Sequence, residues 1–290
     1  MIQSTVQLAR HGQAHGYAIA AVNILDDLSL RAAIAAAVEL SSPLIVQVSV
    51  KTARAIGVDL MTATFVAAAG PAPVPVALHL DHCPDRDLIA AVVAAGWSSV
   101  LFDASDRDLA QAETETGEVV ALAHAAGVDV ESEIENIIGV EDGVGSDTAL
   151  HTYSVEVLAE VAERTGVDLL APQLGTAHGS YSRAPVLLPE RVRALARLSD
   201  RPIVLHGGTG LSEADFRAFI DAGVSKINIS TGLKLAYMRA ARDHTQRAEA
   251  TGKWDPPSMF ADISRAVTAE VAQHLLVFGS AGRADAVAAR

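Results

Sequence analysis

Short runs of β-branched and other apolar residues alternate along the chain with longer, alanine-rich segments whose apolar positions recur at helical spacing. Several of the longer segments end at a glycine, which is typical of a helix C-terminus that leads into the next strand. These glycines are Gly96, Gly127, Gly166 and Gly223. The apolar runs predict strands at about 18–23, 44–49, 75–80, 98–103, 128–134, 167–172, 202–206 and 225–229.

The segments between these runs predict helices, for example Leu30–Leu40, Leu88–Ala95, Leu109–Ala126, Val155–Thr165, Pro189–Leu198 and Glu213–Ala222. Eight strand–helix units in 290 residues fit a (β/α)8 barrel better than a doubly wound sheet, because a barrel needs no second domain. A long helix, Leu233–Ala250, and an amphipathic one, Phe260–Leu276, follow the last strand. We therefore expect an α/β fold: a single (β/α)8 TIM-barrel domain over residues 1–290, with extra C-terminal helices.

Charge and cysteine content narrow the functional classes. The chain has 22 Lys+Arg against 35 Asp+Glu, a formal net charge of −13, which disfavours binding to nucleic acid or to an anionic membrane. Its single cysteine, Cys83, excludes a disulfide framework. The N-terminal residues lack a signal pattern, and the apolar runs are too short for a membrane span. We therefore expect a cytoplasmic protein.

Histidine motifs follow three of the predicted strands. The third strand ends in His79-Leu80-Asp81-His82, the sixth runs into a segment that contains His178, and the seventh ends at His206. The active site of such a barrel lies at the C-terminal ends of its strands, so these side chains converge there. Each histidine alone reads best as a hydrogen-bonded residue at a strand end. Three imidazoles together are a common ligand set for catalytic zinc, and we favour a metal site.

Acidic residues are predicted at the same end of the barrel. Asp81 adjoins His82, and because neighbours on a strand point to opposite sides, one of them must leave the regular pleat for both to face the site. Asp81 is then a metal ligand, a proton-transfer group or the cap of the following helix. Asp103, Glu131 and Glu133 are either supporting or alternative metal ligands, or ion pairs inside the barrel.

Two glycine-rich or hydroxyl-rich turns indicate phosphate binding. Gly207-Gly208-Thr209-Gly210 follows the seventh strand and Asn228–Gly232 follows the eighth. Barrels often build a phosphate site at these places from loop amides and a helix N-terminus. Such a local site explains how an acidic protein would hold an anionic substrate.

At this level of detail the sequence resembles the class II, metal-dependent ketose-bisphosphate aldolases, which include fructose- and tagatose-bisphosphate aldolases. The resemblance is collinear from Ala21-Val22-Asn23 to Phe278–Gly282 and so covers nearly the whole chain. The matching motifs are His79–Cys83, Val100–Asp103, Val130–Glu133, Gly175–Gly179, Leu205–Gly210 and Asn228–Thr231.

The resemblance implies a zinc-dependent aldehyde-lyase of carbohydrate metabolism, with glycolysis as a possible setting, and admits a monovalent cation as well. His82, His178 and His206 would bind the catalytic zinc, while Asp103 and Glu133 match positions used for an alternative metal position.

The same resemblance assigns the catalytic and substrate-binding groups. Asp81 would move the proton of the substrate's C4 hydroxyl, and Glu141 matches a loop glutamate that acts on the triose proton. The triose-phosphate cradle would comprise Gly179, Gly207, Gly208, Thr209, Asn228, Ile229, Ser230 and Thr231, with Asn23, Gln47 and Ser49 lining the same pocket. One product would be dihydroxyacetone phosphate and the other an aldehyde such as glyceraldehyde 3-phosphate.

Some positions depart from the family pattern. Glu135 follows Glu133-Ile134 where the family usually has glycine, and Ala104 replaces the usual glycine after Asp103. The arginine that commonly meets the distal phosphate has no clear counterpart, Arg265 being the nearest candidate. Ser230, where fructose-specific members often carry aspartate, leans toward the tagatose-like branch, but the choice of C4 epimer stays open.

Three other functions remain as alternatives. A Schiff-base aldolase needs a lysine at the site, and the chain has only Lys51, Lys226, Lys234 and Lys253, of which Lys226 is expected to open the eighth strand at the wrong end. A metal-dependent hydrolase would share the metal but would not need two phosphate loops. A non-catalytic, sugar-phosphate-binding regulator would keep the fold and the ligand.

The last predicted helix also bears on assembly. Ile263, Val267, Val271, Leu275 and Leu276 form an apolar stripe at helical spacing, which would dock on the barrel itself or on a partner subunit. Since the family resemblance favours the second, we expect a homodimer or homotetramer.

Overall fold

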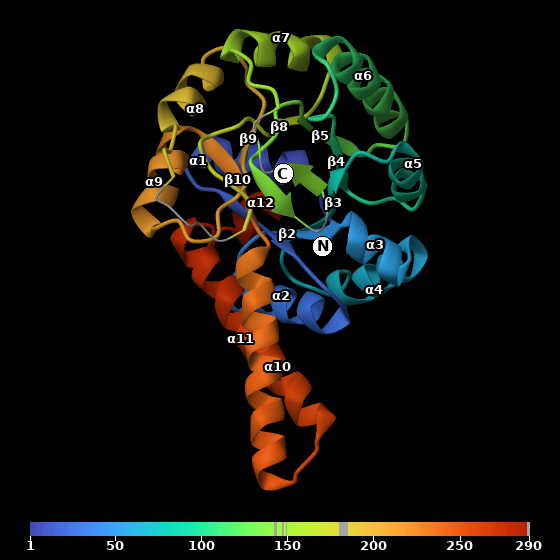
Figure 1. The fold of residues 1–290 in the computed structure, drawn as a ribbon, viewed down its shortest axis with the longest axis vertical. Coiled ribbons are helices and arrows are strands. Elements are labelled where there is room, and N and C mark those ends of the chain that lie inside the picture. Colours follow the sequence, from blue (N-terminus) through green and yellow to red (C-terminus); the bar gives the residue numbers. More distant parts are fainter. Residues whose placement is uncertain (142–143, 147, 149, 180–184, 289–290) are drawn as a thin grey trace.

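The computed structural model describes residues 1–141, 144–146, 148, 150–179 and 185–288. Eight parallel strands close into a barrel in the order β1-β10-β9-β8-β5-β4-β3-β2, and helices surround it (Figure 1). The fold class expected from the sequence is confirmed. The barrel strands are β1 (Ile19–Asn23), β2 (Leu44–Ser49), β3 (Val76–Cys83), β4 (Ser99–Asp103), β5 (Asp129–Glu133), β8 (Leu169–Leu170), β9 (Ile203–Leu205) and β10 (Val224–Ile229).

The helices follow the strands with their ends marked by caps. Asp26 and Ser29 form a capping box at the start of α2, and Ser212 and Asp215 form one at the start of α9. Gly166 ends α7 in the left-handed conformation, as its place in the sequence suggests. The helices are α1 (Thr5–His15), α2 (Asp27–Glu39), α3 (Val50–Ile56), α4 (Val58–Ala69), α5 (Arg86–Ala94), α6 (Leu109–Ala125), α7 (Val155–Thr165), α8 (Pro189–Ala196), α9 (Glu213–Ala222), α10 (Thr231–Thr251), α11 (Pro256–Val277) and α12 (Ala284–Ala288).

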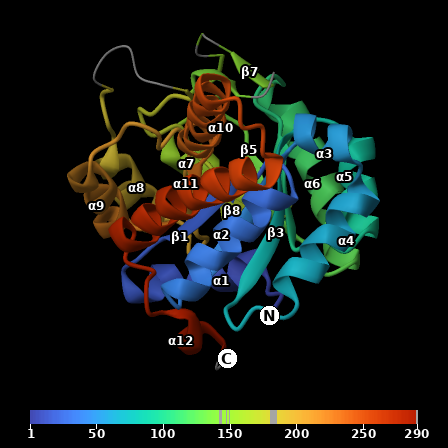
Figure 2. The ribbon, with the colours of Figure 1, turned by 90° about the horizontal axis from the view of Figure 1, so that it is seen from below.

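Helix α1, which the sequence pattern did not predict, covers the N-terminal end of the barrel. Leu8 is buried in a cluster with apolar side chains of β1, β2 and β3, and Thr5 hydrogen-bonds to Ser99 at 2.6 Å. A short antiparallel hairpin, β6 (Gly139–Glu141) and β7 (Val144–Ser146), lies on the opposite side of the molecule (Figure 2). Because α1 covers the N-terminal end of the barrel, a functional site is expected at the C-terminal ends of the strands.

The sixth barrel strand is shorter than expected. A strand was predicted at 167–172, but β8 comprises only Leu169 and Leu170. Pro172 has no N–H to donate to a neighbouring strand, so the ladder ends before it. The chain then continues without regular structure to His178.

Helices α10 and α11 project from the barrel as a helical hairpin, hereafter the arm (residues 231–277; Figure 1). Four of the five stripe residues on α11, from Ile263 to Leu275, are buried in the main core of the same chain, and Thr268 donates to the carbonyl of Ala32 on α2. Only Leu276 is exposed. The stripe therefore docks on its own barrel, so its use as evidence for an oligomer was wrong.

No single helix in the described ranges is long and apolar enough to cross a membrane, although α3 and α4 together, with a 95° bend between them, meet the length and composition required.

Candidate functional site

The end of β3 brings two adjacent side chains to one side of the barrel. Asp81 and His82 are both buried, and the pairing of β3 with β4 shifts between Leu80 and Cys83. His82 has φ +45°, a left-handed conformation that is uncommon for a residue with a side chain. The irregular pleat that the sequence requires for both groups to face the site is therefore present.

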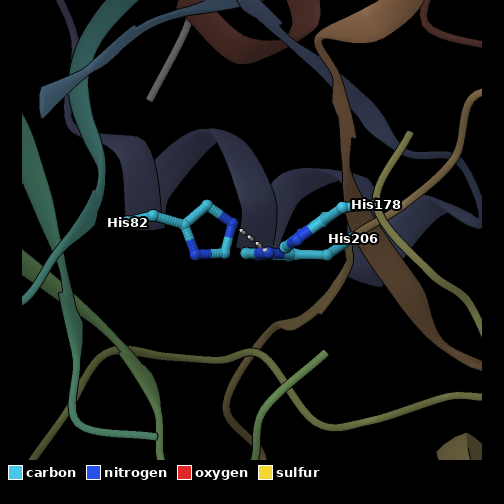
Figure 3. Close-up of side chains that lie close together, drawn as sticks. All are labelled: His82, His178 and His206. Atoms are coloured by element: carbon cyan, nitrogen blue, oxygen red, sulfur yellow. Dashed lines mark hydrogen bonds between the residues drawn. The ribbon is translucent and has the colours of Figure 1, made fainter. Parts of the chain in front are cut away.

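His82, His178 and His206 come from three different strands or strand ends and point toward one another (Figure 3). His206 Nδ1 lies 3.0 Å from His82 Nε2, and ligand nitrogens of all three rings lie within 4.8 Å of one another. Two ring nitrogens directed at each other, with a third close by, fit a divalent metal that prefers imidazole ligands, as Zn²⁺ does.

The other ring nitrogen of His206 is held by a fully buried ion pair. His206 Nε2 lies 2.8 Å from Glu131 Oε1, and Glu131 Oε2 lies 2.8 Å from Lys226 Nζ. A carboxylate on the far nitrogen fixes the orientation and tautomer of a metal-binding histidine. Burial alone would raise the pKa of Glu131, but Lys226 and His206 hold it well below its usual value. Burial lowers the pKa of His206 to about 4.

Lys226 was expected to open the last strand at the end away from the site, where it could not form a Schiff base. It is the third residue of β10, its side chain is completely buried, and it donates to Asn228 Oδ1 at 2.8 Å. The sequence left two interpretations of Glu131, a metal ligand or a member of an ion pair inside the barrel. The structure shows the ion pair, with Lys226. His79 is also an interior residue, hydrogen-bonded to Ser99 at 2.7 Å.

Two further carboxylates lie on the other side of His82. Its Nδ1 is 3.4 Å from Asp103 Oδ2 and 3.5 Å from Glu133 Oε2. Although burial alone would lower it, Asp81, Glu133 and Asp103 raise the pKa of His82 well above its usual value. Burial and the charge of Asp103 raise the pKa of Glu133. His82, Asp103 and Glu133 form a second group of close metal-ligand atoms, and the alternative metal position expected for Asp103 and Glu133 stays a prediction.

Asp81 is fixed by amide side chains on both sides. Its Oδ2 accepts from Asn23 Nδ2 at 2.7 Å and its Oδ1 accepts from Asn228 Nδ2 at 3.3 Å, while Gln47 donates to Asn23 at 2.9 Å. His82 Nε2 lies 4.0 Å from Asp81 Oδ1. Asp81 does not cap α5, because Asp85 does so. The side chain of Asn228, expected in the phosphate cradle, points instead to Asp81 and Lys226.

The two predicted phosphate turns lie side by side after β9 and β10. The amide of Gly232 donates to Thr209 Oγ1 at 3.3 Å, and Gly208 approaches the backbone of Asn228. Among the described residues, the buried hydroxyl of Ser230 has no hydrogen-bond partner. Thr231 begins α10, whose N-cap residue Ser230 makes no side-chain cap, so the N-terminus of this helix with its positive dipole end lies at the turn. The arrangement can bind a phosphate, and Ile229 below it is part of the core.

A backbone hydrogen bond joins the segments that carry His178 and Glu141. The amide of His178 donates to the carbonyl of Ile138 at 2.8 Å, one residue before β6. The backbone of Glu141 ends β6, but its side chain lies outside the described part of the structure. Gly207 has φ +67°, and a Cβ there would lie 2.4 Å from the carbonyl oxygen of Ala177. The segment that carries His178 therefore contacts both the residue before β6 and the turn after β9.

Within the described part of the chain, none of the remaining predicted residues belongs to the three-histidine cluster. Ser49 caps α3, and Lys51 is exposed on its first turn. Gly179 has φ +84°. Arg265 is an exposed residue of the arm that pairs with Asp262, so it offers no evidence for a distal phosphate site.

The comparisons with known proteins agree with this geometry. A family model described as fructose-bisphosphate aldolase class-II matches residues 3–283. The chain is 28% identical to the YdjI aldolase from Escherichia coli K12, with a TM-score of 0.85 over 98% of this chain and 100% of the other. It is 27% identical to a candidate fructose-1,6-bisphosphate aldolase from Coccidioides immitis, with a TM-score of 0.88 over 97% and 98%.

The fold is also shared with fructose-bisphosphate aldolase from Campylobacter jejuni, at 23% identity and a TM-score of 0.81 over 97% of this chain and 96% of the other. Because the family model covers nearly all of the sequence, the chain belongs to the class II fructose-bisphosphate aldolase family, whose members are aldehyde-lyases.

Proposed function

We propose that the protein is a zinc-dependent aldolase that cleaves a ketose 1-phosphate or 1,6-bisphosphate into dihydroxyacetone phosphate and an aldehyde such as glyceraldehyde 3-phosphate. The observation that carries this proposal is the placement of Asp81 beside the three-histidine cluster, with Asp81 Oδ1 4.0 Å from His82 Nε2. Zn²⁺ bound by His82, His178 and His206 would polarise the C2 carbonyl of the substrate and offset the negative charge on its oxygen.

The protein side chains account for the proton transfers. Asp81 takes the proton of the C4 hydroxyl as the C3–C4 bond breaks, and the electron pair of that bond goes to the triose half. Hydrogen bonds from Asn23 and Asn228 fix the orientation of the Asp81 carboxylate. Glu141, by the family resemblance, supplies the proton that C3 then needs. The turns at Gly207–Gly210 and Asn228–Thr231 hold the triose phosphate.

A chelator experiment tests the metal requirement. Removal of the metal abolishes turnover and added Zn²⁺ restores it, whereas borohydride in the presence of substrate has no effect. The only fully buried lysine of the described residues, Lys226, is neutralised by Glu131, so a Schiff base is disfavoured. Full activity of a metal-free sample would refute the proposal.

A coupled assay for dihydroxyacetone phosphate tests the substrate. Fructose 1,6-bisphosphate, tagatose 1,6-bisphosphate and ketose 1-phosphates are compared by kcat/KM. Ser230 in the phosphate turn leans toward the tagatose-like branch, and this comparison decides the C4 epimer, which the sequence leaves open. If no ketose phosphate releases the triose while one still binds, the protein is a sugar-phosphate-binding regulator.

Asp81→Asn separates catalysis from metal binding. The variant keeps the size of the side chain but cannot accept a proton, so we expect kcat to fall by at least ~10²-fold with the zinc content unchanged. His206→Ala is the matched change in a ligand and loses zinc as well as activity. A folded Asp81→Asn protein without zinc would show that Asp81 is a ligand.

We further propose that the protein is a homodimer or homotetramer that associates through the arm. Trp254, Met238 and Phe260 are 66%, 64% and 48% exposed there. Large apolar side chains exposed on a projecting element are typical of an association surface.

A further inference from the structure

Glu135 is a buried carboxylate at a position where glycine was expected from the family resemblance. It lies two residues beyond Glu133, its side chain is completely inaccessible to solvent, and no role has so far been given to it. Burying an ionised carboxylate is costly unless it is fully hydrogen-bonded and paired. Its contacts therefore indicate what it holds.

Both oxygens of Glu135 accept hydrogen bonds from other parts of the chain. Oε1 accepts from the amide of Tyr153 at 2.7 Å and from Arg191 Nη2 at 2.7 Å, and Oε2 accepts from the amide of Gln173 at 2.9 Å. Arg191 Nη2 also donates to the carbonyl of Tyr153 at 2.7 Å. The ion pair between Glu135 and Arg191 is itself largely buried.

These four residues lie at the ends of the two segments that carry site residues, and we call these segment ends the stems. Glu135 and Tyr153 flank the segment that contains the β6–β7 hairpin and Glu141, while Gln173 and Arg191 flank the one that contains His178. One carboxylate thus joins the departing and returning ends of both segments. Glu135 lies two residues beyond Glu133, the last residue of β5, so these contacts are close to the barrel.

Neighbouring hydrogen bonds extend this set of contacts toward the site. Asn136 donates to the carbonyl of Thr148 at 2.8 Å and accepts from the amide of Leu150 at 2.5 Å. On the other segment, the amide of Leu188 donates to the carbonyl of Leu174 at 2.9 Å. Hydrogen bonds therefore join the two ends of each segment to each other. The position of His178 depends on these bonds and on those of Glu135.

We propose that Glu135, together with Arg191, is a positioning residue that fixes His178 for metal binding and holds the hairpin segment over the site. Its effect on turnover rests on the proposed function, whereas its effects on metal affinity and backbone opening do not. A glycine here would leave the amides of Tyr153 and Gln173 and the guanidinium of Arg191 without this acceptor.

Glu135→Gln tests the proposal at constant size. A carboxamide has one oxygen, so whichever way it turns, an NH2 group faces an N–H donor and at least one stem is released. Arg191→Met removes the other partner and serves if Glu135→Gln does not fold. Arg193→Met is the control, because Arg193 lies on the same helix and pairs with Glu190 at the surface.

Two measurements that do not depend on turnover are compared in the holo and metal-free proteins. We expect Glu135→Gln and Arg191→Met to speed amide hydrogen exchange in peptides containing Tyr153 and Gln173 by at least ~10-fold. The Kd for Zn²⁺, measured by competition with a chelating dye, rises by about tenfold. Arg193→Met changes neither. The kcat of the zinc-loaded variants falls more than KM rises, because Zn²⁺ and the hairpin are misplaced rather than the phosphate turns.

The outcomes separate the two proposals. Faster exchange with unchanged zinc affinity and kcat would mean that Glu135 only stabilises the fold, and unchanged exchange would mean that it does not hold the stems; either result overturns the inference. If the wild type itself cleaves no ketose phosphate but the variants still bind zinc more weakly, the proposed function fails and the positioning role of Glu135 stands.

Discussion

His82 and His206 face the same point but differ in their charge environment. His82 is surrounded by Asp81, Asp103 and Glu133, which keep its pKa well above the usual value against the effect of burial. His206 is buried beside His82 and Lys226, and its pKa of about 4 leaves it neutral near pH 7. The metal-free site therefore carries a proton on His82 that a metal must displace.

Zinc binding at pH 7 is accordingly expected to release a proton from His82, and zinc affinity is expected to rise with pH until the pKa of His82 is reached. Calorimetric zinc titrations in buffers of different ionisation enthalpy measure the number of protons released per zinc ion bound. Asp81→Asn removes one of the charges that retain the proton, so fewer are released. Zinc binding without proton release in the wild type would contradict this assignment.

Glu131 and Lys226 neutralise each other inside the barrel, and changing only one of them leaves a buried charge. We expect Glu131→Gln to cost about 3–5 kcal/mol in the free energy of unfolding of the metal-free protein. The double variant Glu131→Gln/Lys226→Met removes both charges and recovers most of that loss. Urea unfolding of the wild type and both variants measures the free energy of unfolding.

Zinc affinity is expected to respond differently in the same variants. His206 loses its carboxylate partner in the single and in the double variant, so both bind zinc about 10–100-fold more weakly. If the double variant were as unstable as the single one, the lone charge of Lys226 would not be the cause.

At the scale of elements, the turn after β9 supports the segment that carries His178. Gly207→Ala places a Cβ against the carbonyl oxygen of Ala177, and Gly252→Ala is the matched control because it has the same φ of +67° with no atom within 4 Å. Both variants bear a left-handed backbone cost of about 1–2 kcal/mol. Only Gly207→Ala is expected to weaken zinc binding, by at least ~10-fold, since His178 must move.

Equal zinc affinities in the two variants would show that the contact between Gly207 and Ala177 does not position the ligand. Thermal unfolding of both proteins separates the backbone cost from the contact.

The elements that the sequence predicted well are those with a clear pattern and caps. β2 has the predicted bounds, and α7 and α9 begin and end where predicted. Helix α1 escaped because its sequence has few apolar residues, although Ser4 caps it and Gly16 ends it. Both of these signals are in the sequence and could have identified it.

Within the site, the histidine motifs and Asp81 were predictable because each lies at or beyond the C-terminal end of a strand. The role of Lys226 was not, since its partner Glu131 is distant in the sequence and a barrel pairs side chains across its interior. A lysine within the apolar run of β10 was the available signal. Glu135 stood out in the sequence as a departure, but its three partners depend on how the segments pack.

At the scale of the whole molecule, the end of the arm around Trp254 projects from the barrel (Figure 1). If it mediates association, Trp254→Ser combined with Met238→Glu lowers the mass measured by light scattering from two or four chains to one. Leu60→Glu on α4 is the control, because Leu60 is 62% exposed but lies outside the arm. A wild-type monomer at micromolar concentration would refute the oligomer.

The hydrogen bond from His178 to Ile138 links the metal-binding segment to the segment that bears Glu141. A ligand that orders one of them biases the other, and the coupling free energy between two sites acts equally in both directions. A phosphorylated sugar that closes the hairpin would then slow the loss of zinc to a chelator, and zinc would tighten sugar binding by the same factor. Under the proposed function, the metal occupancy of this protein would then depend on the sugar phosphates in its surroundings.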